Sequence, residues 1–193
     1  MNEDILQKLE QYECELEKII TQDTPLRDPS ISVIHISKEN IAKGYKHYLT
    51  ILKRLQDKYT NWEYKLLNVE KSFFEILKKR RYLEKQQFVK KTQRDIYKND
   101  LKNSIMNDLM DIIQNEVYLL KEKCKHEGNP PFLVLINMHS TYPYIQTKDV
   151  ISRVINEKGV YIIILYVSDI KHHQGEIESY RYGNYMVHSY FLF

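Results

Sequence analysis

A histidine and two hydroxyl side chains follow an apolar run in the last third of the sequence. The run is Phe132–Ile136, and the polar stretch is His139-Ser140-Thr141. In an open α/β sheet, ligands and catalytic groups gather beyond the carboxyl ends of the strands, where this loop would lie. A nucleophile and its base need a through-space geometry that neighbours on one loop seldom provide, and the sequence has no G-x-S-x-G elbow.

We therefore interpret His139, Ser140, Tyr142 and Pro143 as a structural turn. Its polar groups would satisfy the backbone or touch a partner protein. Tyr142 and Pro143 would pack at the edge of the sheet and fix where the next helix begins.

A carboxylate and a lysine stand two residues apart at Glu63 and Lys65, in a predicted strand. Some metal-dependent nucleases place these two groups on one face of a strand at this spacing. Such a site also needs an upstream metal-binding aspartate, and Asp57 falls in a predicted helix. A solvated strand face with alternating polar residues is the competing interpretation, and a nuclease stays an alternative function.

Two adjacent histidines, His172 and His173, lie near Asp169 and Glu176 in a polar stretch. These side chains are metal-ligand types, but they lack the helical spacing that would direct two of them at one ion. We predict no metal site and no cofactor.

A basic run extends from Lys78 to Lys91 and holds seven basic residues and one acidic residue. Such a run binds phosphate backbones through counterion release, docks an acidic partner, or forms a solvated helical face. The solvated face is favoured, and a DNA contact or a protein contact is the alternative. The residues that would carry the contact are Lys78, Lys79, Arg80, Arg81, Lys90 and Lys91.

Length and composition define the class of protein. The chain has 193 residues, 42% of them hydrophobic and 28% charged, with a net charge of +3. One globular domain of cytoplasmic type, built from residues 1–193, is expected, because no stretch approaches the roughly 20 apolar residues of a membrane span. The five glycines form neither a P-loop nor a G-x-G-x-x-G turn, which argues against classical ATP hydrolysis.

Apolar periodicity predicts the elements that would position these residues. A helix is expected over 1–22, then a strand at Ile31–Ser37 and a helix from Ile41 to Tyr59. A second strand is expected at Glu63–Val69, followed by a helical insertion over 71–126.

The last third contains continuous apolar runs, which indicate strands covered on both faces. These are Phe132–Asn137 and Val160–Val167, with a crossover helix expected over Thr147–Lys158 between them. The closing "YMVHSYFLF" alternates as a final strand would, and docking of Tyr185, Tyr190, Phe191 and Phe193 is expected there. The predicted fold is α/β, with a mainly parallel sheet and flanking helices.

This order of elements, with "FLVLINMHSTYP", "VYIIILYV" and the closing "GNYMVHSYFLF", resembles the BrxB-like family of bacterial BREX phage-defence components. The resemblance covers about residues 25–193. Tyr142 and Pro143 match the aromatic-proline pair of the family, and Asn184-Tyr185 up to Phe191 is similar to its closing segment.

The resemblance implies a degenerate nucleotide-binding sheet without a phosphate loop. It also implies a non-enzymatic assembly component that works beside a PglZ-type partner in phage restriction. A homodimer is compatible with the same interpretation.

Overall fold

The computed structural model describes residues 3–21, 30–81, 94–124, 129–142, 144–155, 157–168, 177–182 and 185–191. Their central feature is a six-stranded sheet with the strand order β2-β3-β4-β1-β6-β5. The strands are β1 (Ile31–Ser37), β2 (Tyr64–Asn68), β3 (Phe132–Ile136), β4 (Tyr161–Ser168), β5 (Ile177–Tyr182) and β6 (Tyr185–Phe191). All neighbours pair in parallel except β5, which runs antiparallel to β6 at one edge.

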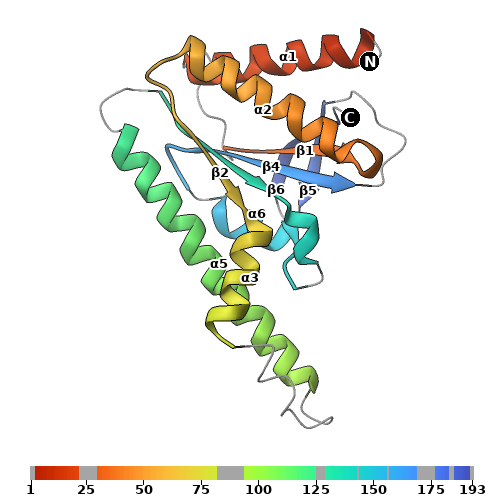
Figure 1. Ribbon diagram of the computed structural model, residues 1–193, viewed down its shortest axis with the longest axis vertical. Coiled ribbons are helices and arrows are strands. Elements are labelled where there is room, and N and C mark those ends of the chain that lie inside the picture. Colours follow the sequence, from red (N-terminus) through yellow and green to blue (C-terminus); the bar gives the residue numbers. More distant parts are fainter. Residues whose placement is uncertain are drawn as a thin grey trace.

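Helices cover both faces of this sheet, as Figure 1 shows. The described helices are α1 (Glu3–Ile20), α2 (Ile41–Lys58), α3 (Val69–Lys79), α5 (Arg94–Cys124) and α6 (Thr147–Val154), with 3₁₀ turns η1 (Lys38–Asn40) and η3 (Met138–Thr141). The α/β class with a mainly parallel sheet and flanking helices, predicted from the sequence, is confirmed.

The first face of the sheet is covered by α1 and α2. Tyr48, Ile51, Leu52 and Leu55 of α2 are buried at spacings of three and four residues, so they form one stripe. This stripe shares a core with Ile34 of β1 and with other side chains that point to the same face. Ion pairs of Arg54 with Glu13 and of Lys58 with Glu17 join the outer sides of the two helices.

The opposite face is covered by α3, α5 and α6. The alternate residues of the same strands, such as Leu133, Leu135 and Ile162, pack there against Phe73 of α3 and Ile113 of α5. Because successive side chains of a strand point to opposite faces, one continuous apolar run supplies both cores.

The helical segment between β2 and β3 contains α3 and α5. Asn68 caps the start of α3, where its Oδ1 accepts a hydrogen bond of 3.0 Å from the backbone N–H of Lys71. Since β2 and β3 are parallel neighbours, these two helices form the crossover connection between them. The segment predicted as an insertion over 71–126 is thus the link that places β3 beside β2.

Two local predictions differ from the structure. The crossover helix expected over Thr147–Lys158 ends at Val154, and Gly159 follows with a φ of 77°, in the left-handed region that glycine tolerates. No strand is predicted between Val167 and the closing segment, whereas Ile177–Tyr182 forms β5.

The final strand predicted at the C-terminus is confirmed as β6. It lies inside the sheet, with Tyr190 opposite Ile34 of β1 and opposite Ile177 of β5. Phe193, the last residue assigned to this docking, is outside the described residues. None of the helices in the described ranges has the length and apolarity needed to cross a membrane.

Candidate functional site

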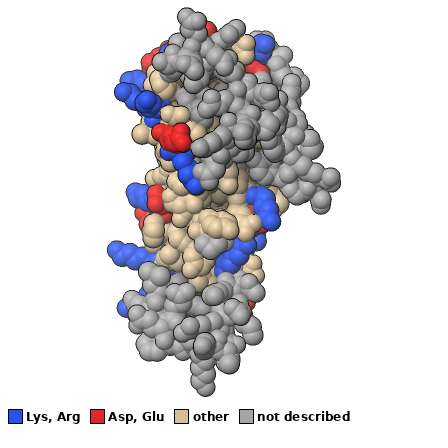
Figure 2. All heavy atoms as spheres, turned by 90° about the vertical axis from the view of Figure 1, so that its right-hand side faces the viewer, with Lys and Arg blue, Asp and Glu red and all other residues tan. Residues whose placement is uncertain are grey.

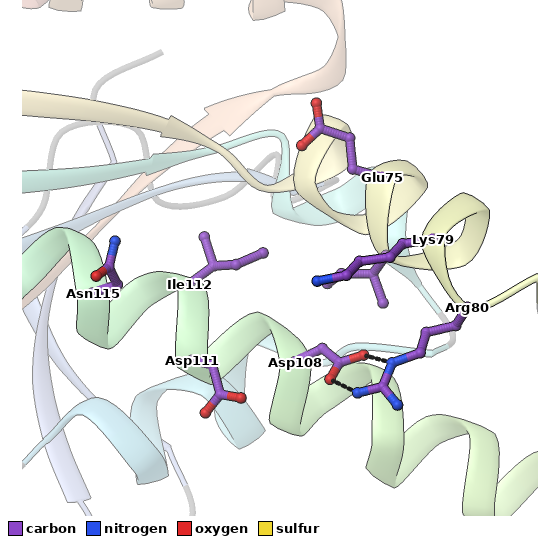
Figure 3. Close-up of a pocket in the computed structure, with 8 residues that line it drawn as sticks. Glu75, Lys79, Arg80, Asp108, Asp111, Ile112 and Asn115 are labelled. Carbon is purple, nitrogen blue, oxygen red and sulfur yellow. Dashed lines mark hydrogen bonds and ion pairs between the residues drawn. The ribbon is translucent and has the colours of Figure 1, made fainter.

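A pocket of about 430 Å³ lies between α3 and α5 on the outer side of the molecule (Figure 3). We call it the α3–α5 groove, and it is lined by Glu75, Ile76, Lys79, Arg80, Asp108, Asp111, Ile112 and Asn115. Two of these residues, Lys79 and Arg80, belong to the predicted basic run. The other wall comes from a helix about thirty positions further along the chain, so the groove exists only after the two helices pack.

One end of the groove is closed by a bidentate ion pair between Arg80 and Asp108. The Arg80 Nε and Nη2 atoms donate to the two carboxylate oxygens at 3.0 and 2.6 Å. The side chain of Asp108 is only 18% exposed, which limits the screening of this pair by solvent. The pair joins Arg80, which directly follows α3, to the middle of α5.

The interior of the groove combines an apolar floor with one cationic group. Figure 3 shows Ile112 and Lys79 pointing toward one another across the space, while the carboxylates of Glu75 and Asp111 are directed away from it. Lys79 takes part in none of the ion pairs of the described residues. A ligand entering here would meet apolar carbon below and an ammonium group above.

The other described residues of the basic run, Lys78 and Arg81, do not line the groove. Lys78 and Arg81 are exposed, and Arg81 follows the helix end with a φ of 54°. Lys90 and Lys91 lie outside the described residues. On the face seen in Figure 2, positive and negative side chains are interspersed around uncharged surface, so the described atoms of that face form no continuous basic field.

A second polar cluster lies at the carboxyl edge of the sheet, directly after β3. Asn137 has a φ of 61°, in the left-handed region that few residues other than glycine and asparagine adopt. Its backbone N–H donates to the hydroxyl of Tyr45 on α2 at 3.1 Å. Its side-chain amide approaches Glu70 at 3.5 Å.

The predicted turn at 138–143 is a 3₁₀ turn, η3. The Thr141 hydroxyl donates to the carbonyl of Met138 at 2.7 Å, as expected for a polar group that satisfies the backbone. Burial lowers the pKa of His139, although the nearby Glu70 opposes this shift. Nδ1 of His139 is buried without a hydrogen-bond partner among the described residues.

The predicted packing of Tyr142 is wrong, because its side chain is 71% exposed. Tyr144 packs instead, with its ring 5.8 Å from the ring of Phe73. Of these two tyrosines, Tyr144 is the one that packs against the core on this face of the sheet. Pro143 lies outside the described residues.

Glu63 and Lys65 both face α5, where each meets an opposite charge. Glu63 immediately precedes β2 and pairs with Lys123 at 2.6 Å, while Lys65 pairs with Glu116 at 3.4 Å. Asp57 lies near the end of α2, as predicted. Both groups of the nuclease hypothesis therefore link the edge strand to a helix.

The metal hypothesis concerns His172, His173, Asp169 and Glu176, which lie outside the described residues. Within the described part of the chain, no group of three or more histidine, cysteine, aspartate or glutamate side chains could hold a metal ion.

Sequence reasoning did not single out His35, a buried histidine on β1. It is 5% exposed and contacts Tyr166 edge-on at 5.6 Å between ring centroids. Desolvation lowers its pKa from 6.5 to about 4. The signal in the sequence was its position inside a β-branched strand, where a polar side chain must be desolvated.

Comparisons with known proteins give no assignment: no family model matches the chain, and neither the curated proteins nor the solved structures contain a significant match.

Proposed function

We propose that this protein is a non-enzymatic binding component of a bacterial phage-defence complex of BREX type, located in the cytoplasm. The observation that carries the binding role is the α3–α5 groove, an open cavity with an apolar floor on the outer side of the molecule. Surface hollows of this kind are suited to receive side chains of a partner protein.

The described candidates for catalysis favour a binding role over an enzymatic one. Glu63 and Lys65 are engaged in ion pairs with α5, and Nδ1 of His139 is buried. A general base must reach the proton that it removes, and a metal ligand must be free to coordinate.

A PglZ-type protein is the proposed partner. Support for this choice comes from the resemblance of residues 25–193 to the BrxB-like family, including Tyr142 in its aromatic-proline pair. The exposure of Tyr142 suits a contact residue, since aromatic side chains are enriched in the centres of protein interfaces.

Co-expression with the PglZ-type protein encoded near this gene tests the proposal. We expect the two proteins to co-purify, and we expect Leu119→Asp to weaken the complex because Leu119 lies on α5 beside the groove and is 51% exposed. Size-exclusion chromatography with light scattering measures the complex.

Leu49→Asp is the matched control, because Leu49 is also an exposed leucine, at 37%, but lies on α2, which covers the opposite face of the sheet. A wild-type protein that stays a monomer in the presence of every protein encoded beside it would contradict the proposed function.

A further inference from the structure

The α3–α5 groove continues along α5 beyond its pocket. Ile112 and Leu119 are seven residues apart, and two turns of helix bring residues at this spacing back to nearly the same line, about 10 Å apart. Leu119 is 51% exposed, whereas Ile112 is partly buried at the floor of the pocket. An apolar line therefore leads from the pocket onto the open surface.

The charged side chains that line the groove point in different directions. Arg80 and Asp108 neutralise one another at one end of the pocket. Glu75 and Asp111 are turned away, which leaves the Lys79 ammonium as the charged group that projects across the floor (Figure 3). An occupant with an acidic side chain would complement Lys79, and one with a basic side chain would be repelled.

The openness of the groove favours a polypeptide over a small molecule. Sites for small ligands enclose most of the ligand surface. Here Glu75, Lys79, Arg80, Asp111 and Asn115 are all exposed on the walls, and the apolar line leaves the pocket at one side. A helix laid along the groove uses both the pocket and the exposed leucine.

We propose that the α3–α5 groove binds an amphipathic helix of a partner protein. This helix carries two apolar side chains seven residues apart, for Ile112 and Leu119, and an acidic side chain for Lys79 about one turn beyond the first of them, on the side of Asp108. The inference rests on the proposed binding function and adds the chemistry of the partner segment.

Two peptides of about 18 residues, long enough to form a helix in water, test the inference. Both carry leucines seven residues apart in an alanine-rich sequence. About one turn beyond the leucine meant for Ile112, on the side away from the other leucine, one peptide has glutamate and the other has lysine. Fluorescence anisotropy should show that the glutamate peptide binds about three- to tenfold more tightly, the size expected for one favourable and one repulsive contact with an exposed charge.

Charge reversal provides the decisive variant. Lys79→Glu should reverse the preference, so that the lysine peptide becomes the tighter ligand. Lys78→Glu, an exposed neighbour outside the lining of the groove, is the matched control and should leave the preference unchanged. Far-UV circular dichroism verifies that both variants are folded.

Several results would overturn the inference: binding of neither peptide, equal binding of both, or the same effect from the two lysine variants. Hexanoate binding as tightly as the glutamate peptide would identify a small-acid pocket and would also overturn it. If the PglZ-type protein co-purifies but the peptides show no charge preference, the proposed function stands and only the occupant of the groove is wrong.

Discussion

Asn137 illustrates how one residue fixes the carboxyl edge of the sheet. Its φ of 61° is tolerated by glycine and strained for alanine. We expect Asn137→Ala to lower the free energy of unfolding by at least about 1 kcal/mol more than Asn137→Gly does. Both substitutions remove the amide that approaches Glu70, so the difference between them isolates the backbone.

Urea denaturation, followed by the fluorescence of the buried Trp62, measures this difference. Equal stabilities of the two variants would mean that residue 137 relaxes out of the left-handed region without cost.

The buried His35 makes stability depend on pH. In the unfolded chain it binds a proton near pH 6.5, whereas in the folded protein it does so near pH 4. Between these values the unfolded state binds more protons, so the free energy of unfolding should fall as the pH is lowered from 6.5 to 4. The full shift corresponds to at most about 3 kcal/mol.

His35→Phe should make this part of the pH profile less steep, since it keeps an aromatic ring and removes one of the two described histidines with a lowered pKa, the other being His139. A wild-type profile that is flat between pH 4 and 6.5 would argue against burial of a neutral His35.

At the scale of elements, we interpret the ion pairs of Glu63 and Lys65 with α5 as contacts that hold the edge of the sheet against this helix. We expect no cleavage of plasmid DNA by the purified protein with Mg²⁺ or Mn²⁺. We expect Glu63→Ala to lower the free energy of unfolding by less than about 1 kcal/mol, because its pair with Lys123 is partly exposed. Cleavage that disappears in Glu63→Ala would establish the nuclease.

The four basic residues at the end of α3, at positions 78–81, allow a test of the DNA-binding alternative. Because Asp108 already neutralises Arg80, and because charges of both signs are interspersed on the face in Figure 2, we expect weak DNA binding at most. Simultaneous charge reversal of Lys78, Lys79, Arg80 and Arg81 should therefore change DNA affinity little at physiological salt. Tight binding with a steep salt dependence that this variant loses would assign the run to DNA.

The sequence predicted β3 and β4 because their continuous apolar runs indicate strands covered on both faces. It did not predict β5, whose Glu178 and Arg181 resemble a polar loop. An edge strand carries fewer apolar residues since it has one neighbour.

The α3–α5 groove was only partly predictable. The basic run drew attention to Lys79 and Arg80, but the partners Asp108 and Ile112 come from a helix whose position depends on tertiary packing. The left-handed Asn137 was also missed, since asparagine after a strand is common in ordinary loops.

At the scale of the whole molecule, β6 closes the sheet against β1. Deleting Tyr190–Phe193 removes the backbone pairs of Tyr190 with Ile34 and of Phe191 with His35 in the interior of the sheet. We expect loss of the cooperative thermal transition, because total stability is only about 5 to 15 kcal/mol for a domain of this kind.

Deleting only Leu192 and Phe193 keeps every described pair of β6 and is the control. Differential scanning calorimetry compares the two truncations. An unchanged melting temperature after the longer deletion would show that β6 contributes little to the fold.

The two outer strands of the sheet have a consequence for assembly between copies of the chain. β2 is only five residues long, and its second residue, Lys65, is 48% exposed and pairs with Glu116 of α5. The opposite edge, β5, carries Glu178 and Arg181. Short, charged borders discourage the addition of a foreign strand. A homodimer built by extending one sheet into the next is therefore disfavoured, and self-association would have to use the helical surfaces.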